Sequence, residues 1–173
     1  MATAIRIPIE QYLATSYEPD AEYVNGEIEE RNVGEYDHNL VQWAILDWLR
    51  RHDKEWQTRS IQEQRTRLSA GSVRIPDVGV WARSVPIQPV FTHPPLIAIE
   101  VLSPEDRQSK MQERIDDYRC FGVLNVWIVD PVKRLGWNCS DGNWIRTDHF
   151  NVSDSQIFLD LSELFKTLDA AEA

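Results

Sequence analysis

Apolar side chains recur at helical spacing in one long segment of the chain. This pattern predicts a helix over residues 37–52, whose apolar face is formed by Val41, Ala44, Ile45, Trp48 and Leu49. Trp43 and Leu46 extend the apolar surface beyond that face. We therefore expect the helix to be covered on a second side, either by another element or by a second copy of the chain.

Short apolar runs of strand length follow in the middle of the chain. They predict buried strands at residues 78–81, 96–102 and 123–129. Threonines and a closing turn favour a further strand within residues 57–68. These strands lie between predicted helices, which indicates a mixed α/β fold.

Turn residues and a second helical pattern complete the predicted elements. Residues 21–31 predict a hairpin because Asn25 and Gly26 can adopt the positive φ angles of a tight turn, and a further hairpin is expected at Asp141 and Gly142. Helices are predicted at residues 9–14, 104–121 and 161–168. The second of these would form a right-handed crossover between the strands of Glu100 and Trp127.

The length and composition indicate one domain of ordinary size. The chain has 173 residues, and we expect a domain over residues 5–169 followed by a short tail over residues 170–173. Its two cysteines and the lack of an apolar signal region predict reduced thiols and a cytoplasmic location. No apolar run is long enough to predict a membrane span.

The formal net charge of −10 is opposite to that of most sequence-independent nucleic-acid binders. It counts against a general DNA coat. It does not exclude a nuclease, because carboxylates that gather around a metal ion add negative charge and a local basic stripe can still contact phosphate.

Two carboxylates stand at positions where a charge is costly. Glu100 interrupts an apolar strand, and Asp77 follows Pro76 at the start of another. Together with a backbone carbonyl, they would suit Mg²⁺ or Mn²⁺. Alternatively, Glu100 pairs with an arginine such as Arg74 and Asp77 caps a turn. Both interpretations stay open on these residues alone.

Four short motifs in this order resemble the large bacterial family known as the "putative restriction endonuclease" domain, which belongs by fold to the PD-(D/E)XK nucleases. The motifs are RIPD at residues 74–77, IEVLSP at residues 99–104, DY at residues 117–118 with GV at residues 122–123, and WIVDP at residues 127–131. The resemblance extends over about residues 12–164. It implies a restriction-endonuclease-like mixed sheet flanked by helices, a metal held by Asp77 and Glu100, and hydrolysis of a phosphodiester.

The chain departs from the superfamily pattern two residues after Glu100, where Leu102 replaces a lysine. A cation from the following helix could take over the lysine's electrostatic role. At 100° per residue, Arg107, Lys110 and Arg114 line one edge of that helix. We select Lys110 as the candidate, although all three cations could equally lie along a solvated helix border.

The family pattern also suggests two accessory residues. Glu22, ahead of the Asn-Gly hairpin, would be an outer metal ligand, and His38 would be a hydrogen-bonding group or proton relay. Near a helix start, His38 could equally be part of ordinary capping chemistry. The other histidines and the cysteines share no ligand spacing, so we predict no zinc site.

The leading hypothesis is therefore a Mg²⁺- or Mn²⁺-dependent endonuclease that hydrolyses nucleic acid, DNA in the first instance, and acts as a homodimer without membrane contact. Its catalytic residues would be Asp77, Glu100, Lys110, Glu22 and His38. The alternative is a catalytically inactive nuclease fold that binds DNA or protein, which Leu102 and the net charge of −10 favour.

Overall fold

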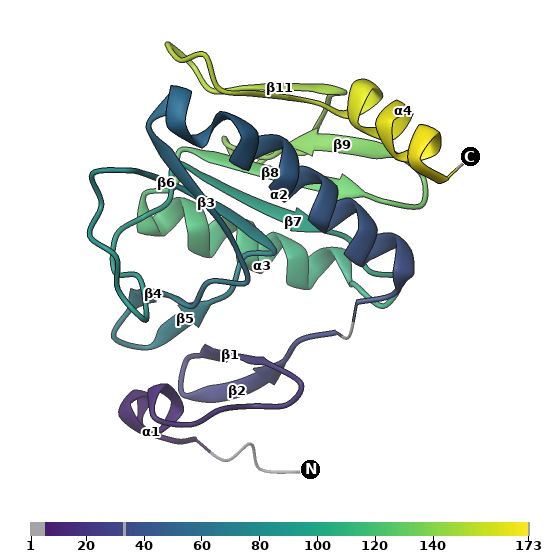
Figure 1. The fold of residues 1–173 in the computed structure, drawn as a ribbon. Coiled ribbons are helices and arrows are strands. Elements are labelled where there is room, and N and C mark those ends of the chain that lie inside the picture. Colours follow the sequence, from purple (N-terminus) through teal and green to yellow (C-terminus); the bar gives the residue numbers. More distant parts are fainter. Residues whose placement is uncertain (1–5, 33, 173) are drawn as a thin grey trace.

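A computed structural model describes residues 6–32 and 34–172 of the chain, except for the side chain of Glu172. Its main layer is a six-stranded sheet, with α2 on one face and α3 on the other (Figure 1). A smaller sheet and α1 lie below this layer, and β11 and α4 lie above it (Figure 1). The mixed α/β, single-domain architecture confirms the predicted fold class.

The described residues form four helices and twelve strands, which turns and loops connect. The helices are α1 (Ile9–Leu13), α2 (Tyr36–Trp56), α3 (Gln108–Phe121) and α4 (Leu161–Glu172). The strands are β1 (Ala21–Val24), β2 (Glu27–Glu30), β3 (Thr58–Gln62), β4 (Thr66–Ser69), β5 (Ser72–Arg74), β6 (Val78–Ala82), β7 (Ile97–Val101), β8 (Asn125–Asp130), β9 (Leu135–Asn138), β10 (Ile145–Arg146), β11 (His149–Asn151) and β12 (Phe158–Asp160).

The larger sheet has the strand order β10-β9-β8-β7-β6-β3. Only β7 and β8 pair in parallel, and α3 connects them, as the predicted crossover between the strands of Glu100 and Trp127 requires. All five residues of β7 are buried, including Glu100. Parallel strands in the middle of a sheet that is covered on both faces account for their almost continuous apolar sequence.

Alternate side chains of the central strands enter two separate cores. Val78, Ile99 and Trp127 join residues of α2 and α4 in one cluster. Ala98 and Ile128 join residues of α3 in the other. Glu100 has the same parity as Ala98 along β7, so its side chain points toward α3. The alternation of the strand therefore directs a carboxylate into the α3 core.

The smaller sheet has the order β2-β1-β5-β4 and packs against α1. Its β1–β2 hairpin turns at Asn25 and Gly26, whose φ angles of 52° and 91° confirm the predicted tight turn. Glu22 on β1 is completely buried. The hairpin thus carries a buried carboxylate to the boundary between the two sheets.

Several element boundaries differ from the sequence prediction. The strand expected within residues 57–68 is two strands, β3 and β4, in different sheets. α2 continues to Trp56, and Gln57 ends it in the left-handed conformation. α3 begins only at Gln108, and α4 extends through the predicted tail to Glu172. The predicted domain start at residue 5 lies outside the described residues.

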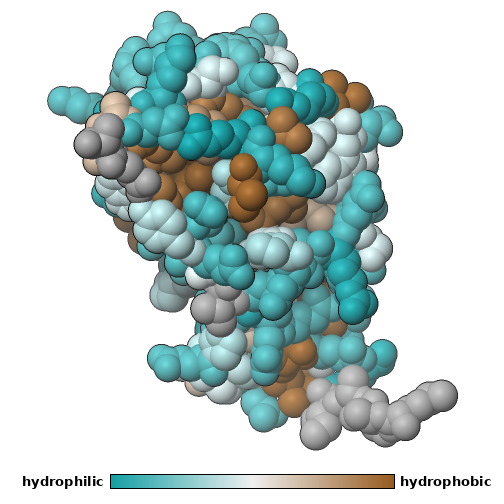
Figure 2. Space-filling view, turned by 90° about the vertical axis from the view of Figure 1, so that its right-hand side faces the viewer, coloured by the Kyte–Doolittle hydropathy of each residue, from teal (hydrophilic) through white to brown (hydrophobic). Residues whose placement is uncertain are grey.

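The apolar surface of α2 is divided between core and solvent. Leu46 is buried in the cluster under α2, whereas Trp43 is 58% exposed. Figure 2 shows hydrophobic side chains interrupting the hydrophilic surface in the upper part of the face that it displays. None of the described helices is both long and apolar enough to cross a membrane.

Candidate active site

Asp77 and Glu100 lie at the ends of two neighbouring inner strands of the six-stranded sheet. β6 and β7 are antiparallel, with Val78 opposite Ile99. Continuing this register by one residue places Asp77 opposite Glu100. The side chains of both residues are almost completely buried, at 4% and 1% exposure. Asp77 and Glu100 thus occupy opposite positions on neighbouring strands, where β6 begins and β7 ends.

Asp77 is held by three donors. The backbone N–H of Val101 donates to Asp77 Oδ2 at 2.7 Å, and Arg31 Nη2 donates to Asp77 Oδ1 at 2.5 Å. His38 Nε2 lies 3.4 Å from Asp77 Oδ2. Burial acts to raise the pKa of Asp77, but the contacts with His38 and Arg31 outweigh burial and lower it. Asp77 is therefore ionised, and its carboxylate lies against the basic side chains of Arg31 and His38.

Glu100 is held by two side chains of α3. Tyr118 donates from its hydroxyl to Glu100 Oε1 at 2.6 Å, and Arg114 Nη1 donates to Oε2 at 3.1 Å. Burial, followed by the negative charge of Asp77, raises the pKa of Glu100 to about 8. The surroundings thus lower the pKa of Asp77 and raise the pKa of Glu100.

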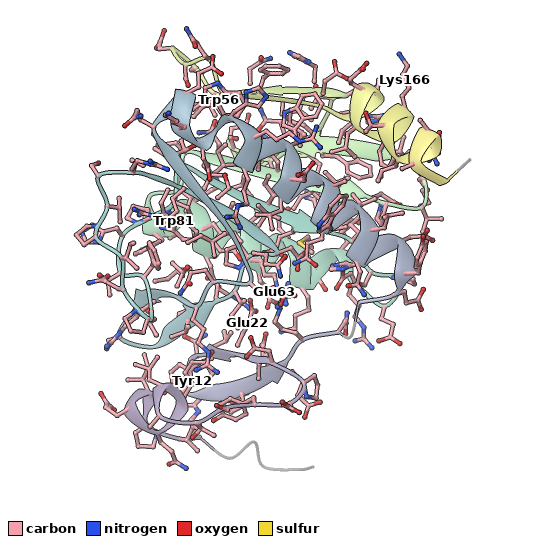
Figure 3. All side chains as sticks on the ribbon, in the orientation of Figure 1. Tyr12, Glu22, Trp56, Glu63, Trp81 and Lys166 are labelled. Carbon is pink, nitrogen blue, oxygen red and sulfur yellow. The ribbon has the colours of Figure 1, made fainter. Side chains whose placement is uncertain are left out.

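Arg114 joins Glu100 to the smaller sheet. Its Nη2 lies 3.3 Å from Glu22 Oε2, while Nη1 bonds Glu100. Glu22 also accepts hydrogen bonds from Arg74 Nη1 at 2.7 Å and from the backbone N–H of Ile75 at 2.8 Å. Figure 3 shows Glu22 between the β1–β2 hairpin and the six-stranded sheet. One guanidinium therefore bridges carboxylates from two sheets.

The structure brings four of the five predicted site residues into one network and leaves the fifth at its margin. Lys110 is 57% exposed and pairs with Glu29 at 3.4 Å and with Glu113 at 2.9 Å. The cation in contact with Glu100 is Arg114, one helical turn further along α3. Because α3 begins at Gln108, Lys110 lies in its first turn, beside the hairpin.

Glu100 does pair with an arginine, as one of the two earlier interpretations expected, but that arginine is Arg114. Arg74, the suggested ion-pair partner, bonds Glu22 and Asp117 instead. Leu102, at the position of the expected lysine, packs against the cluster under α3. Arg31 was not predicted as a site residue, because it is the last residue of the predicted hairpin and no pattern in the sequence relates it to Asp77.

A cavity of about 20 Å³ opens beside Asp77. It is lined by Arg31, Asn32, His38, Asp77, Val101, Ser103, Asp106 and Arg114. Among the residues that the structure describes, no three His, Cys, Asp or Glu side chains converge on one ion position. Two carboxylates nevertheless suit Mg²⁺, which usually keeps several waters and takes one or two protein carboxylates. The two carboxylates thus fit such an ion in type and number, although only Asp77 of the two lines this cavity and the guanidinium groups of Arg31 and Arg114 would have to give way to the ion.

Comparison with known proteins places the chain in a family. Residues 9–165 match Uma2, described as "Putative restriction endonuclease". The chain belongs to this family. The match covers all three sheets, α2, α3 and every residue of the candidate site, so the buried carboxylates of this Uma2 protein lie inside the shared region.

One solved structure shares the fold of this chain. The crystal structure of "a putative nuclease belonging to DUF820" from Anabaena variabilis matches with a TM-score of 0.79 and 23% sequence identity. The alignment covers 94% of this chain and 99% of that one. No curated protein matches the chain. The likeness at this identity concerns the fold alone.

Proposed function

We propose that this Uma2 protein is a metal-dependent endonuclease of the PD-(D/E)XK type that hydrolyses phosphodiesters in DNA. The observation that carries the proposal is the opposite placement of two buried carboxylates, Asp77 and Glu100, on adjacent strands, with the guanidinium of Arg114 on Glu100. The family description agrees with this reaction class. Mg²⁺ or Mn²⁺ would be held by Asp77 and Glu100, and would activate water and offset charge on the phosphate.

Each remaining side chain has a role that follows from its contacts. Arg114 takes the place of the superfamily lysine, since it is the cation beside Glu100, and would stabilise charge that develops on the phosphate. Glu22 holds Arg114 from the far side and acts as a positioning residue. His38 orients Asp77 through Nε2. Burial acts to lower the pKa of His38, but the hydrogen bond and charge of Asp77 outweigh burial and raise it, which favours the charged form of the imidazole.

Arg31 differs from the other cations because it bonds Oδ1 of Asp77, the first of the two residues that would hold the metal ion. Its Nη2 is 2.5 Å from Asp77 Oδ1, and Nη1 is 3.6 Å from Glu63. Metal entry would require Arg31 to release Oδ1, and the freed guanidinium would then be close enough to contact the substrate phosphate. Arg31 would thus balance the charge of Asp77 before the metal binds.

One observation favours a second candidate function. Every carboxylate oxygen of Asp77 and Glu100 already has a protein partner, as expected of a structural ion network. In that case the chain would be a catalytically inactive nuclease fold that binds DNA or protein. Arg31 is the contact that distinguishes the two functions, because only the enzyme requires it to leave Asp77.

The proposal is tested by incubating the purified protein with plasmid, linear duplex and single-stranded DNA in Mg²⁺, Mn²⁺ or EDTA. Cleavage should require the metal, and Asp77→Asn should abolish both cleavage and Mn²⁺ binding, since it removes the charge that attracts the ion. Asp116→Asn is a matched control, because Asp116 is an exposed aspartate on α3. Metal-independent cleavage, or full activity of Asp77→Asn, would refute the proposal.

A further inference from the structure

A larger cavity lies beside the candidate active site, at the carboxyl ends of β7 and β8. Its volume is about 590 Å³. We call it the aromatic cleft; its lining includes Leu102, Met111, Val132, Lys133, Trp137 and Trp144. The carboxyl ends of parallel strands are a common place for ligands in α/β sheets. A cavity of this size can enclose a small organic group.

The aromatic cleft adjoins the cavity at Asp77. Ser103 and Asp106 line both cavities. A third cavity, of about 350 Å³, shares Asp106 and Arg107 with the cleft and shares Arg114 with the cavity at Asp77. The three therefore neighbour one another around the segment that leads from β7 into α3. A chain molecule bound at Asp77 could place an adjoining group in the cleft.

Two tryptophans form the most characteristic part of the lining. Trp137 and Trp144 meet edge to face, with ring centroids 5.7 Å apart and an interplanar angle of 66°. Trp144 Nε1 donates to Gln112 Oε1 on α3 at 2.8 Å, which fixes the orientation of its ring. Both rings are only partly buried. Rings that are held in place and partly exposed suit stacking with a flat partner.

The charged side chains of the cleft balance one another. Arg107 is exposed, and Lys133 reaches Asp130 only at 3.9 Å. Two carboxylates, Asp130 and Asp106, offset the charge of these two cations. Asp130 accepts a hydrogen bond from the backbone N–H of Lys133, and Asp106 accepts one from the backbone N–H of Ser103. The cleft thus has no excess of positive charge to attract a phosphate. Its chemistry favours a neutral, flat ring with a polar edge.

We propose that the aromatic cleft binds one unstacked nucleobase of the DNA strand whose phosphodiester lies at Asp77 and Glu100. The inference rests on the proposed nuclease function and narrows its substrate to single-stranded or locally unpaired DNA. A base inside a regular duplex is stacked on both faces and cannot enter such a cleft without leaving the helix. The protein therefore selects strands in which a base is already free.

The first test measures binding without cleavage. A labelled short oligothymidylate, an abasic strand of equal length and the corresponding duplex are titrated with the full-length protein in Ca²⁺, a hard cation offered in place of Mg²⁺. The parent should bind oligothymidylate more tightly than either of the others. Trp144→Ala should weaken binding of oligothymidylate about 10-fold and leave abasic binding unchanged. Trp144→Phe, which keeps a flat ring, should restore most of the affinity.

A control variant and a measurement on the parent protein show whether weaker binding by Trp144→Ala comes from loss of the ring or from misfolding of the variant. Ile87→Ala removes an exposed apolar side chain that is not part of the cleft lining, and it should bind every strand like the parent. Strands that carry 5-bromodeoxyuridine are also cross-linked to the unaltered protein by ultraviolet light and mapped by mass spectrometry. Cross-links should fall on Trp137, Trp144 or Met111.

The outcomes separate this inference from the proposed function. Equal binding of oligothymidylate by the parent and Trp144→Ala would overturn the inference, as would cross-links confined to other segments or no binding of oligothymidylate by the parent. Cleavage that depends on Asp77 would then still stand. Conversely, binding that depends on Trp144 without cleavage in Mg²⁺ or Mn²⁺ would keep the base site and refute hydrolysis.

Discussion

Replacing Arg114 should impair both folding and catalysis in a way that no neighbouring cation reproduces. Its side chain is 18% exposed and bridges two fully buried carboxylates, Glu22 and Glu100. Arg114→Gln leaves both acids without this cation, and loss of one partner from a buried ion pair costs about 3–5 kcal/mol. Glu22 keeps Arg74, and Glu100 can retain its proton, so we expect a loss near 3 kcal/mol, toward the lower end of that range.

The catalytic effect should be measured separately from the effect on stability. Cleavage of single-stranded DNA is followed with saturating Mn²⁺ at a temperature where denaturation curves show the variant to be folded. Arg114→Gln should lower kcat by about 10²-fold, the scale for one preorganised electrostatic group. Arg114→Lys should recover part of the activity, because an ammonium can reach Glu100 but cannot bridge two carboxylates as a guanidinium does.

Lys110→Gln is the matched control on the same helix. Lys110 is 57% exposed, and its pairs with Glu29 and Glu113 lie at the surface. Surface pairs contribute about 0–1 kcal/mol, so this variant should match the parent in stability and in kcat. A loss of cleavage in Lys110→Gln together with normal cleavage in Arg114→Gln would refute the reasoning and return the catalytic role to Lys110.

Three further predictions follow from the buried charges and the surface of α2. Burial and the charge of Asp77 raise the pKa of Glu100 from 4.5 to about 8, so between these pH values the metal-free folded state holds a proton that the unfolded chain releases. The free energy of unfolding should therefore fall as the pH rises through this range, and Glu100→Gln should flatten the slope. Arg74→Met should destabilise the protein by about 3 kcal/mol in denaturant titrations, because it leaves Glu22 buried with less positive charge; an unchanged midpoint would contradict this. Light scattering should give a homodimer that Trp43→Asp dissociates, and a monomeric parent at micromolar concentration would count against this role of Trp43.

The sequence predicts the central elements well because their patterns are strong. The run of apolar residues around Glu100 has few alternatives to a buried strand, and Asn25-Gly26 fixes its hairpin locally. Shorter elements were missed for the opposite reason. β5 and the pair β11–β12 have three residues each, too few to establish a period of two, and their pairing depends on contacts distant in sequence.

The candidate site was predictable only in part. A carboxylate in an apolar strand points to Glu100, and the place of Asp77 after Pro76 at a strand start, together with the family motif, points to Asp77. The choice between Lys110 and Arg114 depends on where α3 begins and on its rotation against β7, which a helical period alone cannot supply. One signal was available: Arg114 lies four residues before Tyr118, so both share a helical face, and that face meets Glu100.

The position of Arg31 had no signal in the sequence. It follows β2 in a connecting segment, and it reaches Asp77 across 46 positions of the chain. Such a contact results from the way the smaller sheet sits against the larger one. Under the proposed function it is also the contact that metal binding would alter, so the part of the site that sequence reasoning missed would bear directly on the proposed reaction.

The most direct test of the account is a crystal structure of the protein soaked in Mn²⁺, with the metal located by anomalous scattering. The account predicts one Mn²⁺ ion in contact with carboxylate oxygens of Asp77 and Glu100, at about 2.0–2.6 Å, with Arg31 withdrawn from Asp77 Oδ1. The account would be contradicted by crystals in which Mn²⁺ binds elsewhere, or not at all, while Arg31 remains bonded to Asp77 and Arg114 to Glu100.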